Sequence, residues 1–130
     1  MPRATIVKEE ILEKNMRLLA IYIETKNAVL VLLSEAEDQL GTLAASVPPT
    51  AELIATPLLS SVLLGDRNTT TARMLAERLA NKTGKIGLVS IYLKTISETE
   101  ANPVLMKLFE KVTTVNKAEQ EHREGESVSI

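Results

Sequence analysis

The first third of the chain has hydrophobic residues in the pattern of β-strands. Two runs rich in Ile, Leu and Val, Met16 to Thr25 and Asn27 to Ser34, are separated by Thr25-Lys26-Asn27. Two such runs with a short polar segment between them are typical of a β-hairpin, so antiparallel pairing is predicted. The second run is apolar at both its odd and its even positions from Ala28 to Leu33. We therefore expect a central strand that is covered on each side.

Further strands are predicted on both sides of this hairpin. Gly41 to Val47 reads as a short strand ended by Pro48-Pro49, because proline has no N–H to donate to a neighbouring strand. Two more strands are predicted, at Leu58 to Leu64, which Gly65-Asp66 ends, and at Lys85 to Lys94. Thr5 to Glu13 fits an edge strand or a short helix, and its Thr-Ile-Val start favours the strand.

A first amphipathic helix is predicted after Gly65-Asp66. Asp66, Asn68 and Thr69 to Thr71 are all residues whose side chains accept hydrogen bonds from free amides at a helix start, and Gly84 suits the left-handed residue after its end. At 100° per residue one face of this helix is small and apolar and is expected to pack on the sheet. It consists of Ala72, Leu75, Ala76, Leu79, Ala80 and Thr83.

A second helix is predicted to begin at Asn102-Pro103, with Asn102 as the cap and Pro103 at the first helical position. Its apolar stripe consists of Val104, Leu105, Leu108, Phe109, Val112 and Val115. Together these elements predict an α+β fold, in which an antiparallel sheet of about six strands packs with two amphipathic α-helices.

The chain divides into residues 1–115, predicted to form a single α+β domain, and residues 116–130, predicted to be a polar tail. The tail lacks the apolar residues needed to dock on a core, so we expect it to be frayed or disordered. An alternative is that Lys117 to Arg123, which are fair helix formers, extend the preceding helix into solvent.

Composition argues against catalysis and against cofactors. The 130 residues include no cysteine, and the single histidine, His122, lies in the polar tail. Thiolate nucleophiles, cysteine-bound metals and histidine-based acid–base chemistry are therefore excluded or nearly so. We expect no enzyme, no catalytic residue, no cofactor and no metal site. The lack of cysteine also fits a reducing compartment, so we expect a cytoplasmic protein, with the nucleus as a second location that stays open.

We also expect no nucleic acid and no membrane as a partner. The net charge is −2, and only three residues are aromatic, two Tyr and one Phe, so neither a basic excess nor a stacking platform is present. The richest apolar run, Ala28 to Leu33, is far shorter than the roughly 20 residues of a membrane-spanning helix.

Positive charge is concentrated in the middle of the chain. Residues 66–94 hold six basic and two acidic side chains, a local charge of +4. On the polar face of the first helix, Arg73, Arg78 and Lys82 surround Met74. An apolar side chain on a basic face is a feature of protein contacts, so these four residues form a candidate partner-binding face, with an ordinary solvated face as the alternative.

One segment carries a family resemblance. Leu63-Leu64-Gly65-Asp66, followed by Thr69-Thr70 and by the helix through Lys82-Thr83, is similar to the signature of the proteasome assembly chaperone 4 family. The signature turn and helix residues are Leu63, Leu64, Gly65, Asp66, Thr69 and Thr70. The similarity continues more loosely over Lys85 to Leu93, into the last helix, and back over Leu18 to Ser34.

The resemblance implies a non-enzymatic chaperone. Such a protein pairs with a related subunit, similar to proteasome assembly chaperone 3, and binds proteasome α subunits transiently while the α-ring of the 20S core particle is built. The expected partners are therefore α subunits and either a chaperone 3-like subunit or a second copy of the chain. The alternative function is a dimeric adaptor or scaffold of another assembly or trafficking complex.

Overall fold

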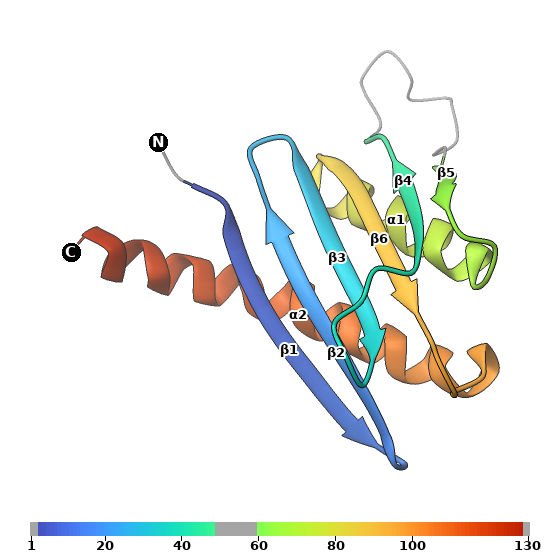
Figure 1. Cartoon of the computed structure of the whole chain (residues 1–130). Coiled ribbons are helices and arrows are strands. Elements are labelled where there is room, and N and C mark those ends of the chain that lie inside the picture. The colour runs from blue at the N-terminus through green and yellow to red at the C-terminus, as the bar shows by residue number, and fades with distance from the viewer. Residues whose placement is uncertain (1–2, 49–59, 129–130) are drawn as a thin grey trace.

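Six strands form one sheet in the order β1-β2-β3-β6-β4-β5, and both helices lie on the same face of it (Figure 1). The computed structural model describes residues 3–48 and 60–128. The strands are β1 (Thr5–Glu13), β2 (Met16–Glu24), β3 (Ala28–Glu35), β4 (Thr42–Ser46), β5 (Ser60–Leu64) and β6 (Ile86–Tyr92). The helices are α1 (Thr69–Thr83) and α2 (Glu98–Val128). The predicted α+β fold, with about six strands and two helices, is confirmed.

Several local predictions are confirmed in detail. The Thr5–Glu13 segment is a strand, and β2 and β3 form the predicted antiparallel hairpin around Thr25 to Asn27, where the Thr25 N–H donates to the Ala28 carbonyl at 2.8 Å. The strand predicted over Leu58 to Leu64 corresponds to β5. Its first two positions, like Pro49, lie outside the described residues.

The sheet differs from the prediction in one pairing, because it is mixed. β3 and β6 run parallel, with Val31 opposite Val89, whereas the other neighbours are antiparallel. Parallel neighbours need a long crossover, which here consists of β4, β5 and α1. Pairing between strands so far apart in sequence depends on how that crossover packs, which a local hydrophobic pattern does not contain.

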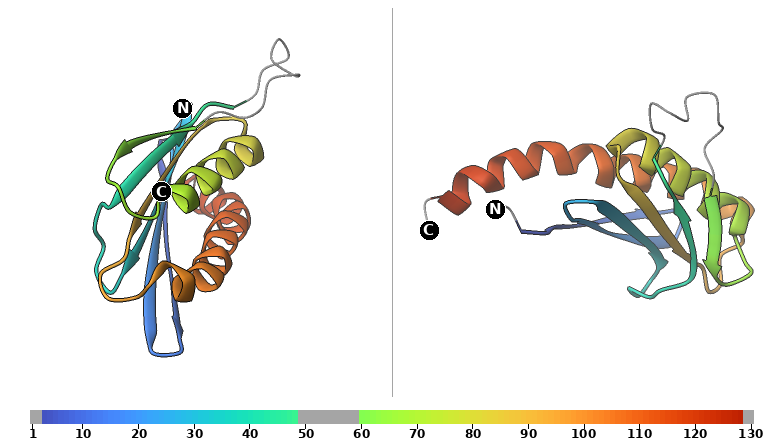
Figure 2. Two further views of the ribbon diagram at one scale, coloured as in Figure 1. Left: turned by 90° about the vertical axis from the view of Figure 1, so that its right-hand side faces the viewer. Right: turned by 90° about the horizontal axis from the view of Figure 1, so that it is seen from above.

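The core lies between the sheet and the helices. Side chains of β2 and β3 that face the helices are buried, Leu18, Val29, Val31 and Leu33 among them, and they meet Leu75 and Leu79 of α1 and Leu105, Leu108 and Phe109 of α2. The opposite face of the sheet has no helix over it among the described residues (Figure 2). Leu30 and Leu32 are consequently only half-buried, so the expectation that this strand is covered on each side is wrong.

Helix α1 has the predicted bounds. Asn68 precedes it in the left-handed conformation, at φ 56°, and its side chain makes no capping hydrogen bond. Gly84 ends it at φ 69°, where its N–H donates to the Ala80 carbonyl at 2.9 Å, as expected for this cap. The predicted inner face is buried except for Thr83, which is half-buried, and Thr71 is buried as well.

Helix α2 begins earlier than predicted. It starts at Glu98, so Pro103 lies inside the helix instead of at its first position. The Ser97 hydroxyl accepts the Glu100 N–H at 3.3 Å and donates to the Glu100 carboxylate at 3.1 Å. Ser97 thus caps the helix as the serine of a capping box does, although Glu100 accepts the Ser97 hydroxyl instead of the Ser97 N–H, and this cap fixes the start of the helix. Residues 116–128 belong to α2, while the division into a domain and a tail stays a prediction.

Candidate partner-binding surfaces

The signature turn connects β5 to α1 at one edge of the sheet. Gly65 has φ +87°, and a Cβ atom there would lie 2.5 Å from Thr42 Oγ1 and 2.8 Å from Thr42 Cα. Only glycine fits this position, since the conformation and the close approach to β4 both exclude a side chain. The turn thus serves a structural purpose. Its two leucines, Leu63 and Leu64, are 54% and 51% exposed.

The threonines of the signature lie in the first turn of α1. Asp66 and Thr70 are exposed, and Thr69 is half-buried. The next residue, Thr71, is buried and donates from its hydroxyl to Glu98 Oε2 at 2.8 Å. This hydrogen bond joins the start of α1 to the start of α2, so the threonine run contributes to packing between the helices.

Two residues of the candidate partner-binding face of α1, Arg78 and Lys82, contact helix α2. Arg78 Nη2 lies 2.6 Å from Glu110 Oε1 of α2, and Lys82 Nζ lies 3.5 Å from Glu110 Oε2 and donates to Thr113 Oγ1 at 3.1 Å. The structure therefore brings Arg78 and Lys82 together around one carboxylate, which joins α1 to α2. Both cations remain partly exposed, so these contacts leave their outer sides accessible.

Arg73 contacts the start of β5, whereas Arg78 and Lys82 contact α2. Arg73 donates from Nε to Ser60 Oγ at 3.1 Å, and the Ser60 hydroxyl also donates to the Glu77 carboxylate. Met74 is 47% exposed. The exposed surface at the start of β5 therefore includes Arg73. No measurement of binding bears on the four residues, and their role in partner binding stays a prediction.

A second candidate surface, whose residues were not predicted from the sequence, is the sheet face opposite the helices, which we call the open face. The strand registers place apolar residues in a row across five adjacent strands of this face. The row consists of Ile6, Ile23, Leu30, Leu88 and Ala45. Except for Ile6, which is exposed, its members are half-buried. The sequence feature that indicates this surface is β3, which is apolar on both faces. Such a strand is expected to be packed against other residues on each face, but the pattern does not show whether these residues belong to the same chain or to a partner.

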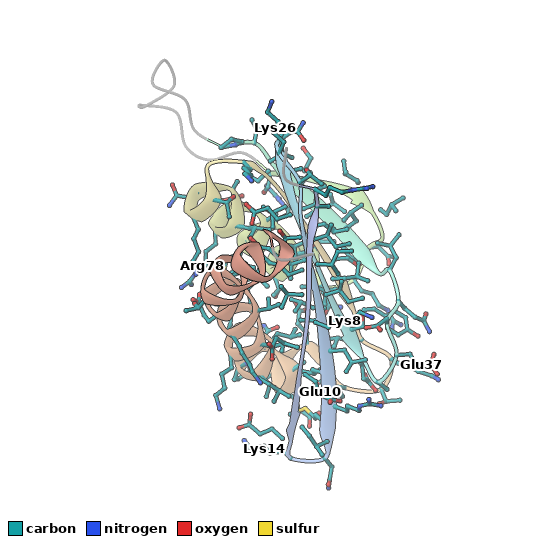
Figure 3. All side chains as sticks on the ribbon, turned by 90° about the vertical axis from the view of Figure 1, so that its left-hand side faces the viewer. Lys8, Glu10, Lys14, Lys26, Glu37 and Arg78 are labelled. Carbon is teal, nitrogen blue, oxygen red and sulfur yellow. The ribbon has the colours of Figure 1, made fainter. Side chains whose placement is uncertain are left out.

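Charged residues on the open face gather at its β1–β2 border. A shallow hollow of about 480 Å³ lies there. Its lining includes Lys8, Glu10, Arg17, Leu19 and, from the loop after β3, Asp38. Arg17 Nε donates to Glu10 Oε2 at 2.5 Å. Figure 3 views the sheet from its β1 edge and shows Arg78 on the helix side and Lys8 and Glu37 on the other. The open face thus has an apolar centre with a charged border.

A buried carboxylate holds the segment between β6 and α2. Glu35, at the end of β3, accepts the N–H groups of Lys94, Thr95 and Ile96 at 2.8, 2.8 and 3.0 Å and the hydroxyl of Thr95. Burial alone would raise the pKa of Glu35, but these hydrogen bonds to the ionised form lower it to about 2. These hydrogen bonds fix the segment that leads from β6 to α2, so the role of Glu35 is to position the start of α2.

Metal-binding clusters and membrane-spanning helices were searched for in the part of the chain that the structure describes. Within residues 3–48 and 60–128, no group of three or more His, Cys, Asp or Glu side chains could hold a metal ion. In the same part of the chain, neither helix is both long and apolar enough to cross a membrane. The two candidate partner-binding surfaces are the exposed polar side of α1 with Arg73, Met74, Arg78 and Lys82, which we call the α1 face, and the open face.

Comparison with known proteins gives a family and a fold. The family model described as proteasome assembly chaperone 4 matches residues 17–93, which run from β2 to the residue after β6. No curated protein matches the chain by sequence. Among solved structures, one described as the crystal structure of a novel chaperone complex for yeast 20S proteasome assembly resembles the chain with a TM-score of 0.67. The two are 14% identical, and the similarity covers 91% of this chain and 98% of the yeast chain.

Proposed function

The chain belongs to the proteasome assembly chaperone 4 family, and from this premise we propose that it is a non-enzymatic chaperone for building the α-ring of the 20S proteasome. It binds α subunits transiently and acts as a dimer with a related chaperone subunit, in the cytoplasm. The resemblance inferred from Leu63 to Thr83 is confirmed by the family match, which includes that segment. A role in proteasome assembly follows from the family.

The observation that carries the proposal beyond the family is the open face. A sheet covered on one side only leaves apolar surface in water, and proteins commonly close such a surface with a partner. A related α+β subunit presents a face of the same kind, and two sheets packed face to face interdigitate their side chains. The chaperone dimer therefore forms through the open face, with the helices on its outside.

Once the open faces are paired, the α1 face stays accessible on the outer side of the dimer. The exposed residues of this face belong to α1, which lies on the other side of the sheet from the open face; they are Arg73, Met74, Arg78 and Lys82. The separation of these two surfaces supports a division of roles, in which the open face binds the second chaperone and α1 contacts an α subunit. Basic side chains there increase the rate of encounter with an acidic surface.

Affinity purification from the source cells tests the proposal. The tagged chain is expected to recover α subunits and a second small chaperone, without the mature core particle. A matched Leu30→Asp chain, altered on the open face alone, is expected to lose the second chaperone. Recovery of trafficking proteins in place of proteasome subunits would support the adaptor alternative and contradict the proposal.

A further inference from the structure

We infer that a hollow between the start of α1 and the segment from β6 to α2 is a docking site for a short acidic segment of an α subunit. The hollow has a volume of about 430 Å³, and its lining includes Arg67, Leu93, Lys94, Ile96 and Glu98. We call it the basic hollow. The inference rests on the proposed function in taking an α subunit as the partner, and it adds a site for that partner outside the α1 face.

The basic hollow brings together two cations that have no partner within the described chain. Residues 66–94 hold six basic side chains. Four of the six contact other side chains of the protein, and these are Arg73, Arg78, Lys82 and Lys85. Within residues 3–48 and 60–128, the side chains of Arg67 and Lys94 make no ion pair or hydrogen bond. The fold thus places both free cations of this basic segment, one from each end of it, around the same hollow.

Hydrogen bonds fix the segments that line the basic hollow. The N–H groups of residues 94–96 donate to the Glu35 carboxylate at 2.8 to 3.0 Å, which holds the backbone on the β6 side. On the other side, Thr71 donates to Glu98 Oε2 at 2.8 Å and ties the start of α1 to the start of α2. The lining is therefore ordered before a partner binds, so binding does not lose the conformational entropy of these segments.

The chemistry of the lining suits a carboxylate next to an apolar side chain. Arg67 and Lys94 are exposed, and a guanidinium binds a carboxylate with two parallel hydrogen bonds. Leu93 and Ile96 are half-buried and pack on the core, so they offer apolar contact beside the cations. With Glu98 as its one carboxylate, the lining has a net charge of +1. Clusters of basic residues recognise acidic peptide motifs in the same way.

The basic hollow is also positioned to act together with the α1 face. Arg67 lies two residues before α1 begins, and Arg73 is the fifth residue of that helix. Both residues are exposed. The helices lie on the side of the sheet away from the open face, so a site at their starts stays accessible when the open faces are paired (Figure 1). One partner can therefore contact the α1 face and place an acidic segment in the basic hollow.

Peptide binding to the purified chain tests the site. The probe is a fluorescein-labelled hexapeptide of alternating Glu and Leu, and a peptide of alternating Gln and Leu is the uncharged comparison. We expect the acidic probe to bind at least about tenfold more tightly than the uncharged peptide. Reversing both cations, with Arg67→Glu and Lys94→Glu, is expected to raise the dissociation constant of the probe at least about tenfold. Fluorescence anisotropy is the measurement.

A variant with the opposite effect separates binding from structure. Glu98→Gln removes the repelling charge from the lining, while the amide oxygen still accepts the Thr71 hydroxyl. It is expected to lower the dissociation constant of the acidic probe about threefold. The affinity for the uncharged peptide should not change. A lining residue with a purely structural role would not produce this gain.

The matched control is Arg3→Glu with Lys26→Glu, which removes the same two residue types and changes the net charge equally. Arg3 and Lys26 are exposed at the end of the sheet where β2 ends and β3 begins. In contrast, Lys94 follows the end of β6, which runs parallel to β3. The control is expected to bind the probe within about twofold of the parent, because long-range charge effects are screened by salt. Circular dichroism and thermal melting establish folding, and Arg67→Gln with Lys94→Gln replaces the reversal if the latter is unfolded.

Three results would overturn the inference. They are equal binding of the acidic and uncharged peptides, an equal loss of affinity in the control and in the folded basic-hollow variant, and competition by inorganic phosphate as tight as the probe at constant ionic strength. The last result would identify a site for small anions in place of a protein segment.

Affinity purification with the same variants connects the site to the proposed function. The basic-hollow variant is expected to recover less α subunit than the parent while it still recovers the second chaperone. If the parent recovers α subunits and the folded variant recovers as much, the inference fails while the proposed function stands. If the parent recovers no α subunit although its basic hollow binds the probe, the proposed function and the stated partner fail while the acidic docking site stands.

Discussion

Glu110 of α2 lies 2.6 Å from Arg78 of α1, so a residue predicted from sequence to face a partner is already paired within the chain. Lys82 shares the same carboxylate at 3.5 Å. The three groups are partly exposed, so the ion pairs contribute at most about 1 kcal/mol each to the stability of the fold. A partner with an acidic surface would therefore compete with Glu110 for the two cations at a modest cost.

Charge reversal on α1 separates binding from folding. The double variant Arg78→Glu and Lys82→Glu is expected to associate with α subunits more slowly at low salt, with a weaker salt dependence, because it removes the positive charge that steers encounter. Its melting temperature should fall by a few degrees, since both new carboxylates lie near Glu110. Adding Glu110→Lys restores opposite charges between the helices, so it should recover the melting temperature but not the association rate. Stopped-flow association at two salt concentrations is the measurement, and a parental rate in the double variant would exclude this face as the contact.

Glu35 is expected to stabilise the fold in a pH-dependent way. Its pKa is lowered to about 2, whereas an unfolded glutamate titrates near 4.3, so the stabilisation is full above the unfolded value and is lost as the pH falls towards 2. Glu35→Gln should therefore lower the free energy of unfolding by roughly 2–3 kcal/mol at pH 7. The difference between parent and variant should shrink at pH 3. Urea unfolding at the two pH values checks this, and an equal difference at both would contradict the stated role of the carboxylate.

Gly65→Val tests the signature turn. The substitution places a branched side chain at φ +87° and against the backbone of Thr42, so we expect a loss of about 2–3 kcal/mol in stability. Gly84→Ala is the matched control, because Gly84 has φ +69° but no atom within 4 Å of an added Cβ. It should cost only about 1 kcal/mol. Equal melting temperatures for the parent and Gly65→Val would show that the glycine is not required by the turn.

Local patterns were sufficient for most elements of the fold. The hairpin around Thr25 to Asn27 and the end of α1 at Gly84 follow from turn residues, the glycine cap and periodicity, which act over a few neighbouring residues. The side-chain cap predicted for the start of α1 is absent at Asn68. The predicted start of α2 was wrong because two local sequence patterns that favour a helix start lie close together there. Asn102-Pro103 resembles a helix start, but Ser97 caps a helix that begins about one turn earlier.

Contacts between segments that are distant in the sequence could not be predicted from local patterns. The parallel pairing of β3 with β6 and the contact of Arg78 with Glu110 each depend on how distant segments pack. Apolar residues on both faces of β3 correctly predicted a central strand, with β2 on one side and β6 on the other. The pattern predicts that Leu30 packs against other apolar residues. A helix of the same chain and the surface of another protein could each provide that contact, and the pattern does not distinguish them. For this reason the residues that form the open face could be identified only from the structure.

The central claim, that the chain is an assembly chaperone working with proteasome α subunits and a second small chaperone, is tested most directly by the mass of its native complex. Complexes isolated through this chain from its own cells can be measured intact by mass spectrometry and then dissociated to identify each subunit. We predict a mass that equals this chain, one related chaperone subunit and one or more α subunits, without mature β subunits. A mass that corresponds to this chain alone or to its homodimer, or a complex without any α subunit, would contradict the claim.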